Sequence, residues 1–243
     1  MSKHLILNSR GGNYYDYMDM HFDSPHFSPP GTPTWYRNSR VFPDRTECYR
    51  TLERFDIPTP IWGLVKRLKL PNANPKTLIV VYTDELSHQG YGKELMSLHQ
   101  ANEKYPDCLC VEYVYSVDFY SNRMSIGKGG DGISRRYLMI GESAWELEYR
   151  SQIDWRSNVG EVDIDVLGPL KDDTLKMKMI DMMKEYRSPI FALDVVPESE
   201  ERWLCTDLNL APGMDNVGMK EFVGPKQASD LIKDFYHKYC VQT

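Results

Sequence analysis

The chain has 243 residues, 41% of them hydrophobic and 26% charged, a composition that indicates a soluble globular protein and excludes a disordered one. Its 29 basic and 35 acidic residues give a net charge of −6, which excludes a global positive field for nucleic acid or anionic lipid. The N-terminal apolar run is too short for a signal peptide, and no segment approaches a membrane span. The five cysteines lack zinc-like pairing, so we expect reduced thiols in a cytoplasmic protein.

The first part of the chain changes character at about residue 44. Residues 1–43 are rich in Gly, Pro, Tyr, Asp and His and lack periodicity, so we expect an ordered loop or arm. After them, Cys48, Leu52 and Phe55 recur at helical spacing. Asp44 precedes this pattern and is a suitable N-cap, so a helix is predicted to begin there.

The middle of the chain alternates between strand and helix patterns. The segment 56–65 leads through prolines into extended chain, and the β-branched run 74–83 predicts a buried strand. A loop is predicted over 84–92, a helix over 93–105 and a further strand over 107–120.

The second half predicts two strand pairs, each followed by a helix. The expected elements are a hairpin of 133–141 and 143–152, a helix over 170–187, two strands separated by a charged turn within 192–213, and a helix over 225–240. This mixed order predicts an α+β or α/β protein with antiparallel sheets.

Three oxygen-bearing side chains accompany the last two predicted strands. Asp207 and Asn209 are two residues apart, so on a strand both point to one face. If the strands pair as neighbours, Asp194 reaches that face too. Such a set suits a hard cation, because Mg²⁺ takes one or two carboxylates and completes its shell with phosphate oxygens and water. The alternative is a hairpin with polar residues on its solvent face.

The stretches "ALDVV" and "WLCTDLNLAPG" resemble the C-terminal metal-binding signature of the ATP-grasp superfamily. That signature places an Asp on one strand and an acidic residue, any residue, Asn and a Pro-Gly turn on the next. Asp194 and Asn209 match it, and Asp207 stands where the family more often has Glu. The resemblance implies that these three residues bind Mg²⁺ and that ATP is the cofactor.

Two upstream segments extend the resemblance to possible catalytic residues. Residues 155–158, "WRSN", are similar to the aromatic-Arg-Ser-Asn segment of ribosomal-protein glutamate ligases. This similarity implies that Arg156 holds phosphate and the developing acyl-phosphate charge, with Asn158 among the cofactor contacts. The segment "ISRRYLMIGES" resembles a family strand whose arginine faces the nucleotide phosphates. Arg136 is our first choice for that arginine and Arg135 the second.

Two further segments resemble nucleotide-binding elements of the family. "SHQGYGK" looks like the glycine-rich loop that covers the triphosphate, which implies contacts from Ser87, Gln89, Gly90, Gly92 and Lys93. "CLCVEYV" fits the hinge between lobes, where Glu112, Tyr113 and Val114 would meet the adenine edge.

The chain also departs from the family pattern. The family generally has a Lys at the end of the strand before the glycine loop, and this chain has Tyr82. At the start of the first helix, Arg45 replaces the usual Lys after Asp44. The domain that commonly precedes the ATP-grasp domain is missing or cut to about 40 residues, so the resemblance covers roughly residues 36–240.

The resemblance implies an α+β ATP-grasp fold, in which two α/β lobes with antiparallel sheets grip a nucleotide. Residues 1–43 would be an arm or a remnant of the preceding domain, and 44–240 the ATP-grasp domain. Within it, about 76–117 would form the small nucleotide-binding lobe and 133–240 the metal-binding lobe.

The implied function is an ADP-forming, ATP-dependent carboxylate–amine ligase that works through an acyl-phosphate. Its partners would be ATP, a carboxylate substrate and an amine from an amino acid, peptide or protein terminus, with neither nucleic acid nor membrane. Two alternatives stay open. One is a degenerate ATP-grasp protein that binds nucleotide or a protein partner without ligation. The other is an unrelated α+β domain whose acidic hairpin is solvated surface.

Overall fold

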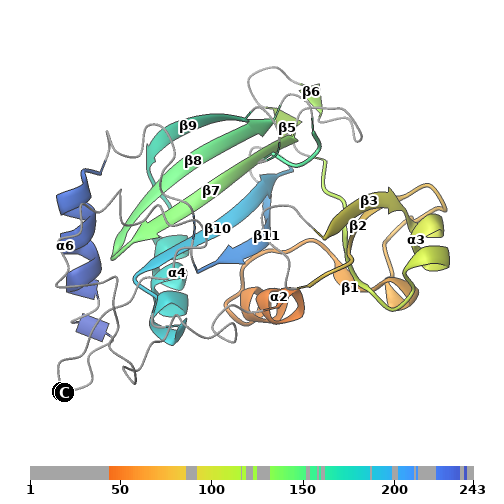
Figure 1. Cartoon of the computed structure of the whole chain (residues 1–243), viewed down its shortest axis with the longest axis horizontal. Coiled ribbons are helices and arrows are strands. Elements are labelled where there is room, and N and C mark those ends of the chain that lie inside the picture. Colours follow the sequence, from red (N-terminus) through yellow and green to blue (C-terminus); the bar gives the residue numbers. More distant parts are fainter. Residues whose placement is uncertain are drawn as a thin grey trace.

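The computed structural model contains two antiparallel sheets with helices beside them (Figure 1). It describes residues 44–85, 92–115, 117–118, 123–124, 132–151, 154–157, 159, 162–186, 188–198, 202–210, 212, 223–235 and 238–239.

The smaller sheet has the strand order β1-β4-β2-β3. Its strands are β1 (Trp62–Leu64), β2 (Leu78–Tyr82), β3 (Lys93–Ser97) and β4 (Leu109–Glu112). A 3₁₀ turn, η2 (Val65–Arg67), and helix α3 (Leu98–Lys104) accompany this sheet.

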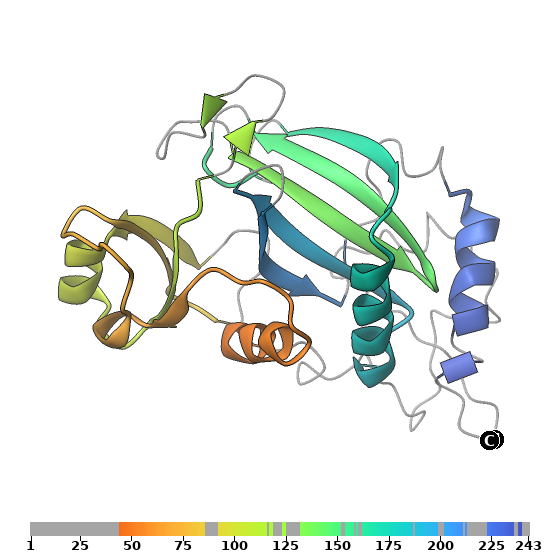
Figure 2. The same cartoon turned by 180° about the vertical axis from the view of Figure 1, so that it is seen from behind.

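The larger sheet has the order β11-β10-β7-β8-β9. Its strands are β7 (Gly132–Ile140), β8 (Ser143–Ser151), β9 (Val162–Pro169), β10 (Ile190–Pro197) and β11 (Trp203–Asn209). Helix α4 (Asp173–Tyr186) lies against this sheet, as Figure 2 shows from behind, and α6 (Pro225–Phe235) lies near β7. Strands β5 (Val117–Asp118) and β6 (Arg123–Met124) form a short two-stranded ribbon. In chain order, this ribbon comes after β4 and before β7.

Helix α2 (Arg45–Arg54) begins where the sequence predicts it. The Asp44 side chain accepts a hydrogen bond from the Glu47 amide at 2.7 Å, which confirms the predicted N-cap. The helix buries Cys48, Tyr49 and Leu52 on one side. In Figure 1 it lies in the region between the two sheets, and its contacts with both are described below.

The predicted helix over residues 93–105 is wrong in its first half. Residues Lys93–Ser97 form β3, which pairs with β2 along its whole length, and helix α3 starts only after Ser97. Ser97 and Gln100 form a capping box that fixes this start. Leu95 and Met96 are both buried, but they belong to different core clusters on the two faces of the small sheet. As a strand, this segment therefore buries apolar side chains on both faces, whereas an amphipathic helix would bury only one.

One strand of the large sheet is absent from the sequence-based prediction. Strand β9 lies at the sheet edge, where Asp163, Asp165 and Leu167 are exposed and alternate with half-buried residues. The alternating letters V-D-I-D-V were the signal for it. By contrast, the predicted hairpin around Gly141 is confirmed as β7 and β8.

The main core runs through both sheets. One cluster of buried residues joins the inner face of the small sheet, α2, the large sheet, α4 and α6. A second, smaller cluster fills the space between the outer face of the small sheet, α3 and η2. Among the helices in the described ranges, none is both long and apolar enough to cross a membrane.

Candidate active site

The predicted metal ligands lie in a row of polar residues across the large sheet. Asp194 of β10 is directly opposite Asp207 of β11 on one side and Arg136 of β7 on the other. Residues directly opposite each other in an antiparallel pair project to the same face, so these three side chains share it. Asn209 follows Asp207 by two residues and has the same orientation along β11.

A register shift follows Asp194 directly. Val195 pairs with Cys205, so Thr206 is an extra residue in β11 between two paired positions. Such a bulge interrupts the alternation of the strand. It allows Cys205 to be buried although Asp207, two residues later, belongs to the polar row.

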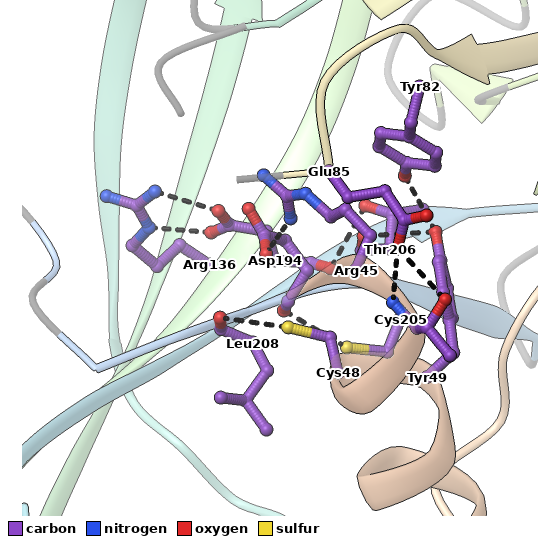
Figure 3. Close-up of polar contacts among 12 residues, drawn as sticks. Arg45, Cys48, Tyr49, Tyr82, Glu85, Arg136, Asp194, Cys205, Thr206 and Leu208 are labelled. Carbon is purple, nitrogen blue, oxygen red and sulfur yellow. Dashed lines mark hydrogen bonds and ion pairs between the residues drawn. The ribbon is translucent and has the colours of Figure 1, made fainter. Parts of the chain in front are cut away.

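Each carboxylate of the row holds an arginine. Arg136 binds Asp194 with two hydrogen bonds, 2.6 Å from Nε to Oδ1 and 2.9 Å from Nη2 to Oδ2. Asp207 forms an ion pair with Nη1 of Arg45, the first residue of α2. The Arg136 guanidinium also lies over the ring of Tyr149, 4.9 Å from the centroid. Figure 3 shows Arg45, Arg136 and Asp194 gathered at one place.

Both arginines keep their charge, although Arg45 is buried and Arg136 is largely shielded from solvent. Burial acts to lower the pKa of Arg45, but the Asp207 carboxylate and the nearby Tyr82 oppose it, and the pKa ends above its ordinary value. For Arg136, burial is likewise opposed, here by Asp194 and Tyr149, and the pKa is again raised. These guanidiniums are therefore fixed positive charges inside the protein.

Lys93 brings a third cation to this place from the small sheet. It is directly opposite Tyr82 on the neighbouring strand, and its Nζ lies 5.5 Å from the centroid of the Tyr82 ring. Burial and the charge of Arg45 lower the pKa of Lys93 to about 8, against the raising effect of Asp207 and Asp194. Lys93 thus places a positive charge beside Tyr82, on the adjacent strand.

Two buried tyrosines connect this region to both sheets. The hydroxyl groups of Tyr49 in α2 and Tyr82 in β2 are 2.8 Å apart, and Tyr49 also donates to the Thr206 carbonyl in β11 at 3.3 Å. Burial raises the pKa of Tyr82 to about 12 and that of Tyr49 well above its usual value, so both are neutral hydrogen-bonding groups. Through these contacts, α2 joins the two sheets at the polar row (Figure 3).

The segment that carries Arg156 lies beside the polar row. Ser157 Oγ is 2.5 Å from Oγ of Ser134, which precedes Arg136 by two residues on β7. The Trp155 ring meets the ring of Tyr113 edge-on, with centroids 6.0 Å apart. Residues 154–157 therefore lie between the end of the small sheet and the row on the large sheet.

Arg156 itself is bound within its own segment. Its Nε and Nη2 donate to Asp154 at 2.9 Å and 2.8 Å, and these hydrogen bonds lower the pKa of Asp154. Gly132, at the start of β7, allows this segment to pack closely. A Cβ atom at Gly132 would lie 2.7 Å from the carbonyl oxygens of both Asp154 and Trp155.

The other predicted nucleotide contacts divide into two groups. Ser87, Gln89, Gly90 and Asn158 lie outside the described residues. Gly92 has a φ of +65°, the left-handed conformation that favours glycine, and its carbonyl accepts from the Thr83 amide.

The predicted hinge residues lie at the end of the small sheet. Glu112 ends β4, and its amide donates to the Ile61 carbonyl at 2.8 Å. Tyr113 is buried beside Trp155, and Val114 is half-buried. Arg135, the second choice for a phosphate contact, pairs instead with Glu146 and Glu148. It follows that Arg135 projects to the face opposite Arg136.

Sequence reasoning did not assign Arg45 to the site. Its signal was its position after Asp44, where the family has a Lys, but only the fold brings it to Asp207, 162 residues away. Tyr149, which contacts Arg136 from β8, had no comparable signal in the sequence.

The chemistry of the site suits a cation that is shared with phosphate. Two carboxylates and the Asn209 amide are hard oxygen donors, while Arg45, Lys93 and Arg136 match phosphate oxygens. Within the described ranges, no group of three or more His, Cys, Asp or Glu side chains is placed to hold a metal. The carboxylates, the amide and the three cations together fit Mg²⁺ bound with a polyphosphate.

Comparison with solved structures finds ATP-grasp ligases. The ligase PsnB complexed with a minimal precursor superposes with a TM-score of 0.54 at 10% identity, covering 84% of this chain and 64% of that one. PsnB with precursor peptide PsnA2 and AMPPNP gives 0.52 at 10% identity, covering 87% and 64%. A RiPP-associated ATP-grasp ligase of Chryseobacterium gregarium, in complex with ADP and a leader and core peptide, gives 0.52 at 12% identity, covering 83% and 63%.

These likenesses are structural. No protein-family model matches the chain, and no curated protein matches it in sequence. The chain spans less than two thirds of the length of these ligases. The order and pairing of its two sheets and the motifs of its last strands nevertheless lead to one conclusion: the chain has the ATP-grasp fold.

Proposed function

We propose that this protein is an ATP-dependent carboxylate–amine ligase that forms ADP. One observation carries the proposal: three cationic side chains lie near two carboxylates on neighbouring strands, at the place where α2 joins the two sheets. The cations are Arg45, Lys93 and Arg136, and the carboxylates are Asp194 and Asp207. The ATP-grasp fold supports it, and so do the relatives of that fold, which were solved with nucleotides and precursor peptides.

The proposed reaction needs no nucleophile from the protein. An oxygen of the substrate carboxylate attacks the γ-phosphorus of ATP, and the bond to the bridging oxygen breaks to release ADP. The amine then attacks the carbonyl carbon of the acyl-phosphate, and phosphate leaves with the electrons of the C–O bond as the amine loses a proton. Catalysis would come from positioning and from neutralisation of charge.

Each charged residue has a place in this proposal. Arg45, Lys93 and Arg136 would hold phosphate oxygens, and Arg156 would stabilise the charge of the acyl-phosphate. Asp194, Asp207 and Asn209 would hold Mg²⁺, which when bound neutralises charge on the phosphates. To take this role, the Arg156 side chain would exchange its hydrogen bonds with Asp154 for contacts with the acyl-phosphate.

The remaining predicted contacts belong to the nucleotide. The adenine would contact Glu112, Tyr113 and Val114, because the chain runs from the end of the small sheet past Trp155 at this point. The predicted loop residues Ser87, Gln89, Gly90 and Gly92, together with Asn158, would contact the phosphates. In this proposal, residues 76–117 act as the nucleotide-binding lobe, 133–240 as the metal-binding lobe and 1–43 as an arm.

A peptide is the proposed source of the carboxylate or the amine. The three structures, two of PsnB and one of the Chryseobacterium gregarium ligase, contain a minimal precursor, a precursor peptide, or a leader and core peptide. A peptide substrate supplies both groups that the reaction requires, because it carries a terminal amine, a terminal carboxylate and side chains of either kind.

A degenerate ATP-grasp protein is the second candidate function. Two observations favour it: Tyr82 occupies the position where the family generally has Lys, and Arg156 is held by Asp154. Such a protein would bind Mg·ATP but would form no ADP in the presence of amino acids or peptides. Measurement of ADP formation with those compounds therefore separates the two candidates.

Replacement of Arg156 tests the proposed reaction most directly. We expect Arg156→Gln to keep the fold and nucleotide affinity but to lose about 10²- to 10³-fold in turnover, as when one charge-stabilising donor is deleted. Turnover is measured as ADP release with a panel of amino acids and peptides. Arg54→Gln is the matched control, because Arg54 forms an exposed ion pair with Glu185 away from the row. Unchanged turnover in Arg156→Gln would remove the proposed role.

Nucleotide binding is tested separately by thermal stability. Mg·ATP at about a hundredfold excess over its dissociation constant should add about 2.7 kcal/mol to the free energy of unfolding. If the melting temperature is the same with and without Mg·ATP, the proposed function is wrong.

A further inference from the structure

The carboxylates of the polar row are engaged in ion pairs before any ligand binds. Asp194 accepts hydrogen bonds from Nε and Nη2 of Arg136, and Asp207 forms an ion pair with Arg45. The side chains of both carboxylates are mostly shielded, with exposures of 19% and 20%, and the two arginine side chains are 11% and 3% exposed. The neighbouring Lys93 adds a third positive charge.

A divalent cation alone faces a clear obstacle at this place. To reach the carboxylate oxygens, it has to displace Arg136 from Asp194 and Arg45 from Asp207. Both guanidinium groups would then lie next to the divalent cation, and no new anion would replace the carboxylates that they had lost. Leaving a buried charge without its partner is strongly unfavourable, and so is bringing like charges together.

A polyphosphate removes this obstacle. Its oxygens accept hydrogen bonds from guanidinium groups in the same fork geometry as carboxylates do. Arg45, Arg136 and Lys93 can transfer to it without losing an anionic partner. The carboxylates released in this exchange become available to a cation, which also gains the phosphate oxygens as ligands.

We infer that the site binds a divalent cation and a polyphosphate as a thermodynamically coupled pair, in which the polyphosphate frees Asp194 and Asp207 from Arg136 and Arg45 and so creates the cation site. This inference rests on the proposed function, because it assumes that the polyphosphate is that of a nucleotide. It adds a rule of occupancy: the polyphosphate binds without the metal, but the metal does not bind without the polyphosphate.

The wild-type protein gives the first test, with two probes measured separately. Mn²⁺ alone is titrated and followed by the electron paramagnetic resonance signal of the free ion, which should be unchanged by the protein. ADP is titrated calorimetrically in EDTA, where it should bind measurably. Repeating the ADP titration in MgCl₂ should strengthen binding by about 5- to 150-fold, the usual range of coupling between sites.

Single arginine variants give the second test, because they should shift the two affinities in opposite directions. Arg45→Gln removes the guanidinium that pairs with Asp207, so Mn²⁺ alone should now bind, while ADP affinity in EDTA should fall. Arg136→Gln should do the same through Asp194 and serves if the first variant does not fold. Arg54→Gln, on the same helix as Arg45, should behave like the wild type in both titrations.

The outcomes separate the two proposals. If wild-type protein binds Mn²⁺ alone as tightly as Arg45→Gln does, or if ADP binds only when metal is present, the coupling is overturned while the proposed function stands. If ADP does not bind in either EDTA or MgCl₂, the proposed function itself fails. A merely structural role for Arg45 is also distinguishable, because it would weaken ADP binding without creating affinity for Mn²⁺.

Discussion

At the scale of single residues, the charge of Lys93 makes the properties of the site depend on pH. Burial and Arg45 lower its pKa from 10.5 to about 8, so its ammonium group is mostly charged at pH 7 and mostly neutral at pH 9. The positive charge that we assign to phosphate binding is therefore lost over a range in which the arginines do not titrate.

Two measurable consequences of this pKa have opposite signs. The unfolded chain binds more protons than the folded one between about pH 8 and 10.5, so Lys93 makes the free energy of unfolding rise with pH in that window. Nucleotide affinity should instead fall, by up to about tenfold per pH unit above 8, because the charge that attracts phosphate disappears. Chemical denaturation and calorimetry from pH 7.5 to 9.5 measure both.

Lys93→Arg is the control for both measurements. Its guanidinium stays charged throughout this range, so both pH dependences should flatten. If the wild-type protein and Lys93→Arg respond to pH in the same way, another group is responsible.

The buried tyrosine pair gives a prediction about stability. Tyr49→Phe removes the hydroxyl that contacts Tyr82 and the Thr206 carbonyl without creating a large cavity. The loss of one buried hydrogen-bonding group should lower the free energy of unfolding by about 1–3 kcal/mol. The control is Tyr105→Phe, whose hydroxyl donates to Glu94 at the surface of the small sheet. If both variants lose the same amount, Tyr49 has no special connecting role.

Residues of the site differ in how far the sequence could predict them. Asp194, Asp207 and Asn209 could be placed on one face because the strand period of two acts locally. The partner of Asp207 could not, since the contact with Arg45 depends on how α2 meets β11. The preference of Arg156 for Asp154, two residues earlier, is local but gave no distinctive pattern.

At the scale of elements, the segment with Arg156 depends on a glycine at the start of β7. Gly132→Ala would place a methyl group 2.7 Å from two backbone carbonyls of residues 154 and 155, so the segment has to shift. We expect a loss of about 1–3 kcal/mol in the free energy of unfolding, as for other overpacked sites, and a fall in turnover.

Gly224→Ala is the matched control for this variant. A Cβ atom at Gly224 would have no neighbour within 4 Å, so stability should change by less than about 0.5 kcal/mol. Equal losses in the two variants, measured by chemical denaturation, would contradict the role of close packing at Gly132.

The elements themselves were predictable where local signals agreed with the tertiary environment. Asp44 marks the start of α2, and the turn at Gly141 marks the hairpin of β7 and β8. The error over residues 93–97 has the opposite cause. Their letters, K-E-L-M-S, suit a helix, but pairing with β2 and burial on both faces of the small sheet override that preference.

At the scale of the whole molecule, the two sheets share one core. Tyr49 and Leu52 of α2 are fully buried in the same cluster as Val80 and Tyr82 of the small sheet and Leu208 of the large sheet. The fold class could be predicted from the order of elements and the motifs, while this continuity between lobes depends on packing that no local pattern encodes.

The shared core predicts cooperative unfolding. Leu52→Ala should lower the free energy of unfolding by about 2–5 kcal/mol, because it deletes a fully buried side chain. Circular dichroism and tryptophan fluorescence should report the same midpoint in both wild type and variant. Separate transitions for the two probes would show that the lobes unfold independently.

The pairing of Arg45 with Asp207 has a consequence for biosynthesis. The two residues are 162 positions apart, so a ribosome makes the arginine long before the aspartate that neutralises it. Until β11 has emerged, the nascent chain carries a cation that its finished form keeps in the interior. The ion pair between α2 and β11 can therefore form only late in translation, and a truncated product that ends before residue 207 lacks the carboxylate that pairs with Arg45.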